Sequence, residues 1–142
     1  MGIESKTIVL GVIGTDPHFI GAKLMEYALT QAGFKVVNLG VMVPPVDFIK
    51  AAIETDACAI MISSLSGYGE SYAEGFRDKC IEAGLNNILL YMGGHIIMGT
   101  DREWKDVQDK FESMGFDRVY PPRTLPDQAI EDLKKDLGIP SE

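Results

Sequence analysis

Short apolar runs rich in β-branched residues alternate with amphipathic segments along the chain, and this alternation predicts an α/β fold. The runs are almost wholly apolar, which is typical of parallel strands that helices cover on both faces. The chain has 142 residues and no linker, repeat or low-complexity segment, so we expect one domain over residues 1–142. At this size the common arrangement is the flavodoxin-like (Rossmann-like), doubly wound sheet of five parallel strands in the order 2-1-3-4-5, with helices on both faces.

The first strand is expected at KTIVLGVIG (6–14), a β-branched run that ends in glycine. A helix is expected over residues 19–33, because apolar residues recur there at helical spacing and a glycine closes the segment. The expected buried face of this helix carries Ile20, Leu24 and Ala28. FKVVNLG (34–40) is short and apolar, which predicts the second strand.

The middle of the chain repeats the pattern. Residues 46–55 follow two prolines and are expected to form a helix, since proline favours helix starts. ACAIMISSL (57–65) predicts a third strand that is buried on both faces. Residues 74–84 continue an amphipathic helix whose inward face carries Tyr72, Phe76 and Cys80. NILLYMGG (87–94) predicts the fourth strand.

The last third of the chain supplies two helices around a short strand. A helix is expected over residues 102–115, a fifth strand within 117–122 and a final helix over 125–138. The expected inward side chains are Trp104, Val107 and Phe111 in the first helix and Ile130, Leu133 and Leu137 in the second.

In this fold, ligands bind beyond the carboxyl ends of the strands, near the point where the strand order reverses. The loops after strands 1, 3 and 4 open on that rim. They read TDPHFIG (15–21), SSLSGYG (63–69) and GGHIIMG (93–99), and each is rich in glycine, serine or polar residues. A functional site is therefore expected there.

The most informative residue on the rim is His18, one of two histidines in the chain. Asp16 stands two residues before it and is near enough to accept a hydrogen bond from the imidazole. A carboxylate behind a histidine fixes its tautomer and raises the basicity of the free nitrogen, which suits a metal ligand or a general base. An ordinary loop histidine remains the alternative.

Other chemistries fit the rim less well. Ser63 or Ser64 could act as a nucleophile, but neither lies in a GxSxG turn. A zinc site would need more ligands than His95, the second histidine, can add, and a solvated rim side chain is the simpler reading of that residue. FMN binding is disfavoured, because the loop after strand 1 carries a single threonine and then bulky residues. A phosphate-accepting receiver domain is disfavoured, because no aspartate follows the third strand.

Composition excludes several classes of partner. The net charge is −8, which argues against nucleic acids and anionic membranes as partners. The N-terminus shows no signal peptide, and no apolar run approaches the length of a membrane helix. Cys58 and Cys80 stand apart in apolar settings, which is typical of reduced, packed thiols. We therefore expect a cytoplasmic protein.

Three short motifs on the rim resemble the cobalamin-binding domain of B12-dependent mutases and methionine synthases, whose pattern reads DxHxxG, SxL and GG. The matching residues are Asp16-x-His18-x-x-Gly21, Ser63-x-Leu65 and Gly93-Gly94. Each motif stands at the strand end that the family requires. The resemblance extends nearly end to end to the small subunits of glutamate mutase (methylaspartate mutase), including KTIVLGVIG, ILLYMGG and DLKKDLGI.

The resemblance implies a role for each motif residue. His18 would displace the dimethylbenzimidazole base of the cofactor and bind cobalt, while Asp16 would hold the other ring nitrogen. Ser63 would hydrogen-bond the displaced base and Leu65 would line the slot that holds it. The two glycines after the fourth strand would let the nucleotide tail lie against backbone. Further cofactor contacts would come from Thr15, Pro17, Phe19, Gly21, Ser64, Gly93, Gly94, His95, Ile96, Ile97, Met98 and Gly99.

The same resemblance implies a function. The chain would bind adenosylcobalamin as the small subunit of an isomerase that interconverts L-glutamate and threo-3-methylaspartate by radical rearrangement. A large barrel subunit would hold the substrate, in a hetero-oligomer of two small and two large subunits, and this chain would carry no catalytic residue and be inactive alone. A mutase for another branched acid stays open. So does a non-catalytic corrinoid carrier, although carriers usually place a helical domain before the first strand.

Overall fold

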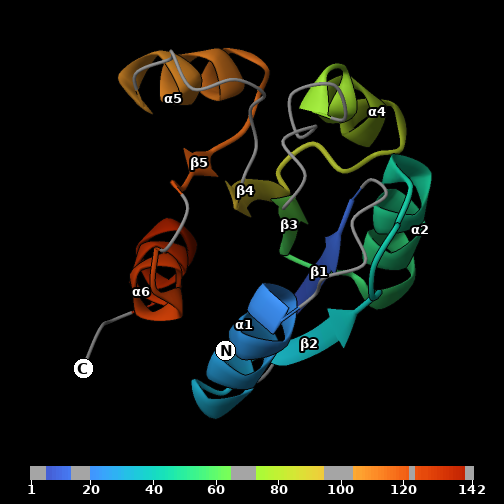
Figure 1. Cartoon of the computed structure of the whole chain (residues 1–142). Coiled ribbons are helices and arrows are strands. Elements are labelled where there is room, and N and C mark those ends of the chain that lie inside the picture. The colour runs from blue at the N-terminus through green and yellow to red at the C-terminus, as the bar shows by residue number, and fades with distance from the viewer. Residues whose placement is uncertain (1–5, 14–19, 65–72, 95–103, 122–123, 140–142) are drawn as a thin grey trace.

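The computed structural model describes residues 6–13, 20–64, 73–94, 104–121 and 124–139. These residues form a five-stranded sheet in the order β2-β1-β3-β4-β5, with helices on both faces (Figure 1). All four pairs of neighbouring strands are parallel. The predicted fold class and strand order are confirmed.

Every expected strand and helix is present, and nearly all are a few residues shorter than expected. The strands are β1 (Thr7–Val12), β2 (Lys35–Asn38), β3 (Ala59–Ser64), β4 (Leu89–Gly94) and β5 (Arg118–Val119). The helices are α1 (Ile20–Gln31), α2 (Pro45–Thr55), α4 (Phe76–Glu82), α5 (Trp104–Ser113) and α6 (Pro126–Leu137). None of the helices in these ranges is long and apolar enough to cross a membrane.

The strand β5 is the shortest described element, with two residues, and it lies within the range 117–122 in which a short strand was expected. One residue beyond it, the Tyr120 N–H still donates to the Met92 carbonyl at 2.9 Å. Pro121 follows, and a proline has no N–H with which to continue the ladder. The strand therefore ends where the sequence places its proline pair.

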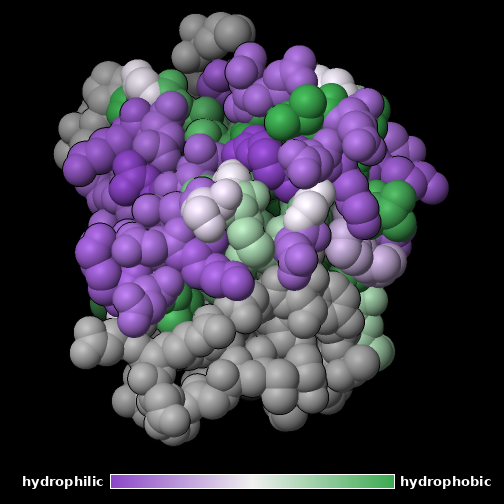
Figure 2. All heavy atoms as spheres, turned by 90° about the horizontal axis from the view of Figure 1, so that it is seen from above, coloured by the Kyte–Doolittle hydropathy of each residue, from purple (hydrophilic) through white to green (hydrophobic). Residues whose placement is uncertain are grey.

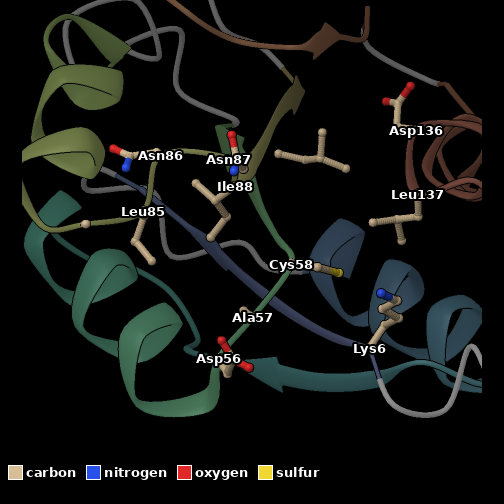
Figure 3. A pocket seen from close by; sticks show the side chains of 12 residues that line it. Lys6, Asp56, Ala57, Cys58, Leu85, Asn86, Asn87, Ile88, Asp136 and Leu137 are labelled. Carbon is tan, nitrogen blue, oxygen red and sulfur yellow. The ribbon is translucent and has the colours of Figure 1, made fainter. Parts of the chain in front are cut away.

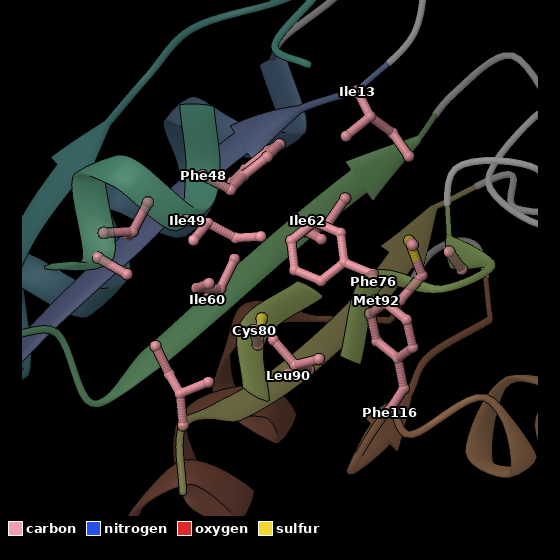
Figure 4. Packing of buried hydrophobic residues seen from close by; sticks show 14 of the residues in the cluster. Ile13, Phe48, Ile49, Ile60, Ile62, Phe76, Cys80, Leu90, Met92 and Phe116 are labelled. Atoms are coloured by element: carbon pink, nitrogen blue, oxygen red, sulfur yellow. The ribbon is translucent and has the colours of Figure 1, made fainter. Parts of the chain in front are cut away.

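Helices α2, α4 and α5 cover one face of the sheet. Each contributes a fully buried phenylalanine: Phe48, Phe76 and Phe111. All three belong to one core cluster with alternate strand residues such as Ile60 and Leu90. Figure 4 shows Phe48 and Phe76 in this layer. Because successive strand residues point to opposite faces, the intervening residues belong to a second core.

Helices α1 and α6 cover the opposite face. Leu29 of α1 and Leu133 of α6 are fully buried there against Leu10 and Tyr91 of the sheet. Figure 1 shows the two helices on the same side of the sheet, opposite α2, α4 and α5. This α1/α6 face also carries the residues of the candidate site.

The buried side of α1 differs from the prediction. Leu24, expected to face the core, is 57% exposed, whereas Leu29 is fully buried and Met25 packs against the same cluster. The prediction was wrong for Leu24, whereas Ala28 does pack against this cluster and the Ile20 side chain lies outside the described residues. Apolar residues occupy several sides of this helix, so spacing alone did not single out one stripe. Tyr27 is also exposed, at 67%.

Arg77 of α4 joins three separate parts of the chain. Its guanidinium donates to the Gly115 carbonyl at 2.9 Å and to the Ile88 carbonyl at 2.7 Å. It also donates to Asp117 Oδ2 at 2.8 Å, and that oxygen accepts a hydrogen bond from the Leu90 N–H. These contacts fix α4 to the start of β4 and to the turn between α5 and β5.

Candidate functional site

The described residues include part of the predicted cobalamin site. Gly21 lies in α1, Ser63 and Ser64 end β3, and Gly93 and Gly94 end β4. The other predicted site residues lie outside the described residues. They are Thr15, Asp16, Pro17, His18, Phe19, Leu65, His95, Ile96, Ile97, Met98 and Gly99.

The ends of the three central strands lie side by side. In the parallel register, Ser63 pairs with Val12 of β1 on one side and with Gly93 of β4 on the other. The Ile13 N–H donates to the Ser63 carbonyl at 3.0 Å, which carries the pairing one residue further. The sheet therefore brings Ser63 and Gly93, the first residues of the SxL and GG motifs, together at one edge.

Ser63 and Gly93 share the sheet face that α1 and α6 cover. Ser63 follows Met61 by two residues and Gly93 follows Tyr91 by two, and both of those side chains belong to the core on that face. The half-buried Ser63 hydroxyl makes no hydrogen bond to another residue in the described ranges. It is therefore free, within those ranges, to bond a polar atom of a ligand.

Gly93 leaves open backbone next to this hydroxyl. A Cβ built on Gly93 would lie 3.7 Å from the Tyr120 Cβ, which is an ordinary van der Waals contact. Nothing in the described residues therefore requires a glycine for folding at this position. A glycine at this position would, however, allow a ligand to approach the backbone closely.

The two cysteines are not poised for chemistry. Both are unpaired, with Cys80 buried and Cys58 half-buried. Burial raises the pKa of Cys80 to about 11 and also raises the pKa of Cys58 above its ordinary value. Both thiols are thus protonated at neutral pH, and neither resembles an activated nucleophile.

Metal binding by the described residues alone finds no support. Within residues 6–13, 20–64, 73–94, 104–121 and 124–139, no group of three or more His, Cys, Asp or Glu side chains converges as a metal site requires. Both histidines lie outside these ranges. Any histidine ligand to a metal would therefore come from outside these ranges.

A polar network on the α1/α6 face was missed by the sequence analysis. Tyr91 donates a short hydrogen bond to Asp136 of α6, and Tyr120 donates to Asp132 Oδ2 at 2.7 Å. Arg118 binds both oxygens of Asp136 at 2.9 Å and lies 3.5 Å from Asp132 Oδ1. The spacing of the two aspartates, one helical turn apart, is the one part of this network visible in the sequence.

The network shifts the pKa values of its members in opposite directions. The hydrogen bonds from Arg118 hold the pKa of Asp136 below its ordinary value. Burial, and then the hydrogen bond to an aspartate, raise the pKa of Tyr91 and of Tyr120 well above the usual range. Asp136 therefore stabilises the fold above about pH 4, and this contribution is lost as the pH falls through its folded-state pKa.

The raised pKa values of Tyr91 and Tyr120 predict a loss of stability in strong base. Above about pH 10 the unfolded chain releases their protons while the folded chain keeps them, so the free energy of unfolding should fall. The expected slope is up to about 1.4 kcal/mol per pH unit for each tyrosine. Urea unfolding between pH 9 and pH 11 (about one unit either side of the unfolded pKa) would measure it. Cys58 and Cys80, whose pKa values are also raised, add to the same slope, so Tyr91→Phe should lower it by the share of one tyrosine, up to about 1.4 kcal/mol per pH unit. An unchanged slope in this variant would contradict the role given to Tyr91.

A surface hollow lies at the other end of the sheet. Lys6, Cys58 and Asn87 line it together with Asp136 and Leu137 of α6, as Figure 3 shows. Cys58 and Asn87 precede β3 and β4, so the hollow opens at the amino ends of the strands. It is therefore separate from the edge at which Ser63 and Gly93 lie.

The side of the molecule that carries α4 and α5 is mainly hydrophilic. Figure 2 views it from above Figure 1 and shows polar residues over most of its described surface, with apolar residues scattered among them. Scattered apolar residues of this kind are usual on protein surfaces.

Comparison with protein families gives a match to the B12 binding domain over residues 6–115. The matched range begins just before β1 and ends after α5, so it includes the ends of β3 and β4. The prediction of a cobalamin-binding domain from the three motifs is confirmed at the level of the family.

Curated relatives match almost the whole chain. The glutamate mutase sigma subunit of Clostridium cochlearium is 58% identical over 137 residues, which cover 96% of this chain and 99% of the relative. The glutamate mutase sigma subunit of Carboxydothermus hydrogenoformans is 57% identical, also over 137 residues that cover 96% of this chain and 99% of the relative. Such identity extends through β5 and α6, beyond the range of the family match.

Among solved structures, the monomethylamine corrinoid protein of Methanosarcina barkeri has the same fold. Its TM-score is 0.74 at 20% identity, and the match covers 92% of this chain. This chain spans 57% of the length of that protein. At this identity the likeness supports the fold, and the function follows from the closer relatives.

Proposed function

Because this chain belongs to the family of glutamate mutase sigma subunits and contains a B12-binding domain, we propose that it carries adenosylcobalamin for the interconversion of L-glutamate and threo-3-methylaspartate. The observation that carries the proposal is the near full-length likeness to sigma subunits, joined to the pairing of Ser63 with Gly93 at the edge of the sheet. These two residues come from two of the three motifs and face the same side.

The residues present fit the cofactor. The Ser63 hydroxyl lacks a hydrogen-bond partner among the described residues, and Gly93 offers bare backbone beside it. We assign Ser63 to the base of the nucleotide tail and the Gly93-Gly94 backbone to the tail itself. Leu65 would line the same slot. The remaining contacts would come from Thr15, Pro17, Phe19, Gly21, Ser64, His95, Ile96, Ile97, Met98 and Gly99.

We assign the axial cobalt ligand to His18, with Asp16 orienting its imidazole. A carboxylate that accepts a hydrogen bond from one ring nitrogen fixes the tautomer in which the other nitrogen can bind metal. When bound, adenosylcobalamin supplies carbon-radical chemistry. The part of this chain is to bind and orient the cofactor and to hold the axial histidine.

The proposal includes a partner. A large barrel subunit would bind the substrate, two of each subunit would assemble, and this chain would be inactive alone in the cytoplasm. We also take residues 1–142 as a single cobalamin-binding domain. In support, α6, which lies beyond the family match, packs on the same sheet face as α1 and buries Ile130 and Leu133 there.

Reconstitution tests the proposed function. The purified chain is mixed with a glutamate mutase large subunit and adenosylcobalamin, and formation of 3-methylaspartate from L-glutamate is followed. We expect turnover in the complete mixture and none when the chain, the large subunit or the cofactor is omitted. Cofactor binding without turnover of glutamate, together with turnover of another branched acid, would contradict the proposed substrate.

A further inference from the structure

Tyr120 lies directly beside the proposed position of the nucleotide tail. The parallel register pairs Met92 with Val119, and continuing it by one residue places Gly93 level with Tyr120. The two are adjacent in space, since a Cβ on Gly93 would be 3.7 Å from the Tyr120 Cβ. A ligand group that lies against Gly93 on this face therefore contacts Tyr120 as its neighbour in the direction of β5 and α6.

Tyr120 is held both by its backbone and by its hydroxyl. Its backbone N–H donates to the Met92 carbonyl at 2.9 Å, and its hydroxyl donates to Asp132 Oδ2 at 2.7 Å. Asp132 is 7% exposed, and Gln128 and Arg118 also contact its carboxylate. A buried carboxylate is stable when it is paired in this way, so the acceptor of the Tyr120 hydroxyl has a fixed position.

Tyr91 offers a close structural parallel that lies farther from the site. It stands two residues before Gly93 on the same face and contacts Tyr120 edge to face, with ring centroids 5.9 Å apart. Its hydroxyl bonds Asp136, one helical turn after Asp132. The two tyrosines thus make equivalent bonds from the sheet to α6, and the Tyr120 bond is the nearer to the strand ends.

We propose that Tyr120 is a positioning residue for the aromatic base of the cofactor's nucleotide tail, and that Asp132 holds it in place. Planar aromatic groups pack favourably edge to face or offset, and a tyrosine ring with a fixed hydroxyl offers such a surface without losing rotamer freedom on binding. This inference rests on the proposed function. It adds one wall to the slot that the motif residues line, and this wall comes from the end of β5 and from α6.

The test compares Tyr120→Phe with the matched control Tyr91→Phe in the complex with the large subunit. Each variant keeps its ring and loses one hydroxyl bond to α6. Affinity is measured by absorbance titration with adenosylcobalamin and with adenosylcobinamide, which lacks the nucleotide tail. We expect Tyr120→Phe to raise the Kd for adenosylcobalamin by about 3–10-fold, the equivalent of one hydrogen bond, and to leave adenosylcobinamide within about 2-fold.

The control variant, Tyr91→Phe, distinguishes an effect on cofactor positioning from an effect on protein stability. Tyr91→Phe should lower the free energy of unfolding as much as Tyr120→Phe does, and yet leave both affinities within about 2-fold of the original chain. The turnover number at saturating cofactor should be unchanged in Tyr91→Phe. Tyr120→Leu, which removes the ring, should weaken adenosylcobalamin binding at least as much as Tyr120→Phe.

Three results would overturn the inference: unchanged affinity in both Tyr120 variants, equal losses in Tyr120→Phe and Tyr91→Phe, or equal losses for the two cofactors. In each case the unmodified complex still binds adenosylcobalamin, so the proposed function stands. Failure of the unmodified complex to bind adenosylcobalamin would instead overturn the proposed function, and this inference with it.

Discussion

Gly115→Ala is expected to lower the free energy of unfolding by about 3–5 kcal/mol, as the sum of backbone strain and overpacking. Gly115 has a φ of +102°, which a side chain disfavours. A Cβ there would lie 2.5 Å from the Arg77 Cβ and 2.7 Å from its Cγ. These atoms are close to the α4 backbone and cannot swing aside, so the hydrogen bonds of Arg77 to Ile88 and Asp117 would be disturbed too.

Gly84→Ala is the matched control for this loss. Gly84 has a φ of +91°, but a Cβ there would meet no atom within 4 Å. This variant should therefore lose about 1–2 kcal/mol, from backbone strain alone. Urea unfolding of both variants gives the comparison, and equal losses would show that the Arg77 contact contributes nothing.

Gly93→Ala is expected to keep the fold and to weaken cobalamin binding by about 10–100-fold. The strand conformation of Gly93 accepts an alanine, and the new Cβ makes an ordinary contact with Tyr120 at 3.7 Å. If the nucleotide tail lies against the Gly93 backbone, the same methyl group overpacks the slot at a cost of about 1–3 kcal/mol. Thermal unfolding without cofactor and absorbance titration with adenosylcobalamin measure the two effects.

The two measurements on Gly93→Ala should differ: stability should be unchanged while cofactor affinity falls. Unchanged unfolding with unchanged affinity would mean that the tail does not approach this glycine. A large loss of stability would mean that the packing around Tyr120 is tighter than the 3.7 Å contact implies. The first result would remove Gly93 from the proposed site, and the second would mean that folding itself requires a glycine there.

The fold was predictable because its strands and helices differ sharply in pattern. The segment ACAIMISSL is apolar up to its two serines, as β3 must be to pack Ile60 against one helix layer and Met61 against the other. The buried face of α1 was not predictable from spacing, because apolar residues occupy more than one side of that helix. Leu24 is consequently exposed where Leu29 is buried.

The site was predictable only in part. The SxL and GG motifs stand at the ends of β3 and β4, and parallel pairing brings Ser63 beside Gly93. The contact of Tyr120 with Asp132 could not be predicted, because it depends on how α6 packs against the sheet. Twelve positions separate these two residues in the sequence, and no local pattern marks them as partners.

The origin of the axial cobalt ligand is the central claim, and electron paramagnetic resonance tests it most directly. The chain is labelled uniformly with ¹⁵N, combined with the unlabelled large subunit and loaded with cob(II)alamin at natural abundance. Binding of His18 to cobalt predicts that each cobalt line splits into a doublet, and that His18→Ala abolishes this doublet. A triplet in the labelled complex would mean that the cofactor's own base still binds cobalt, and would contradict the assignment of His18.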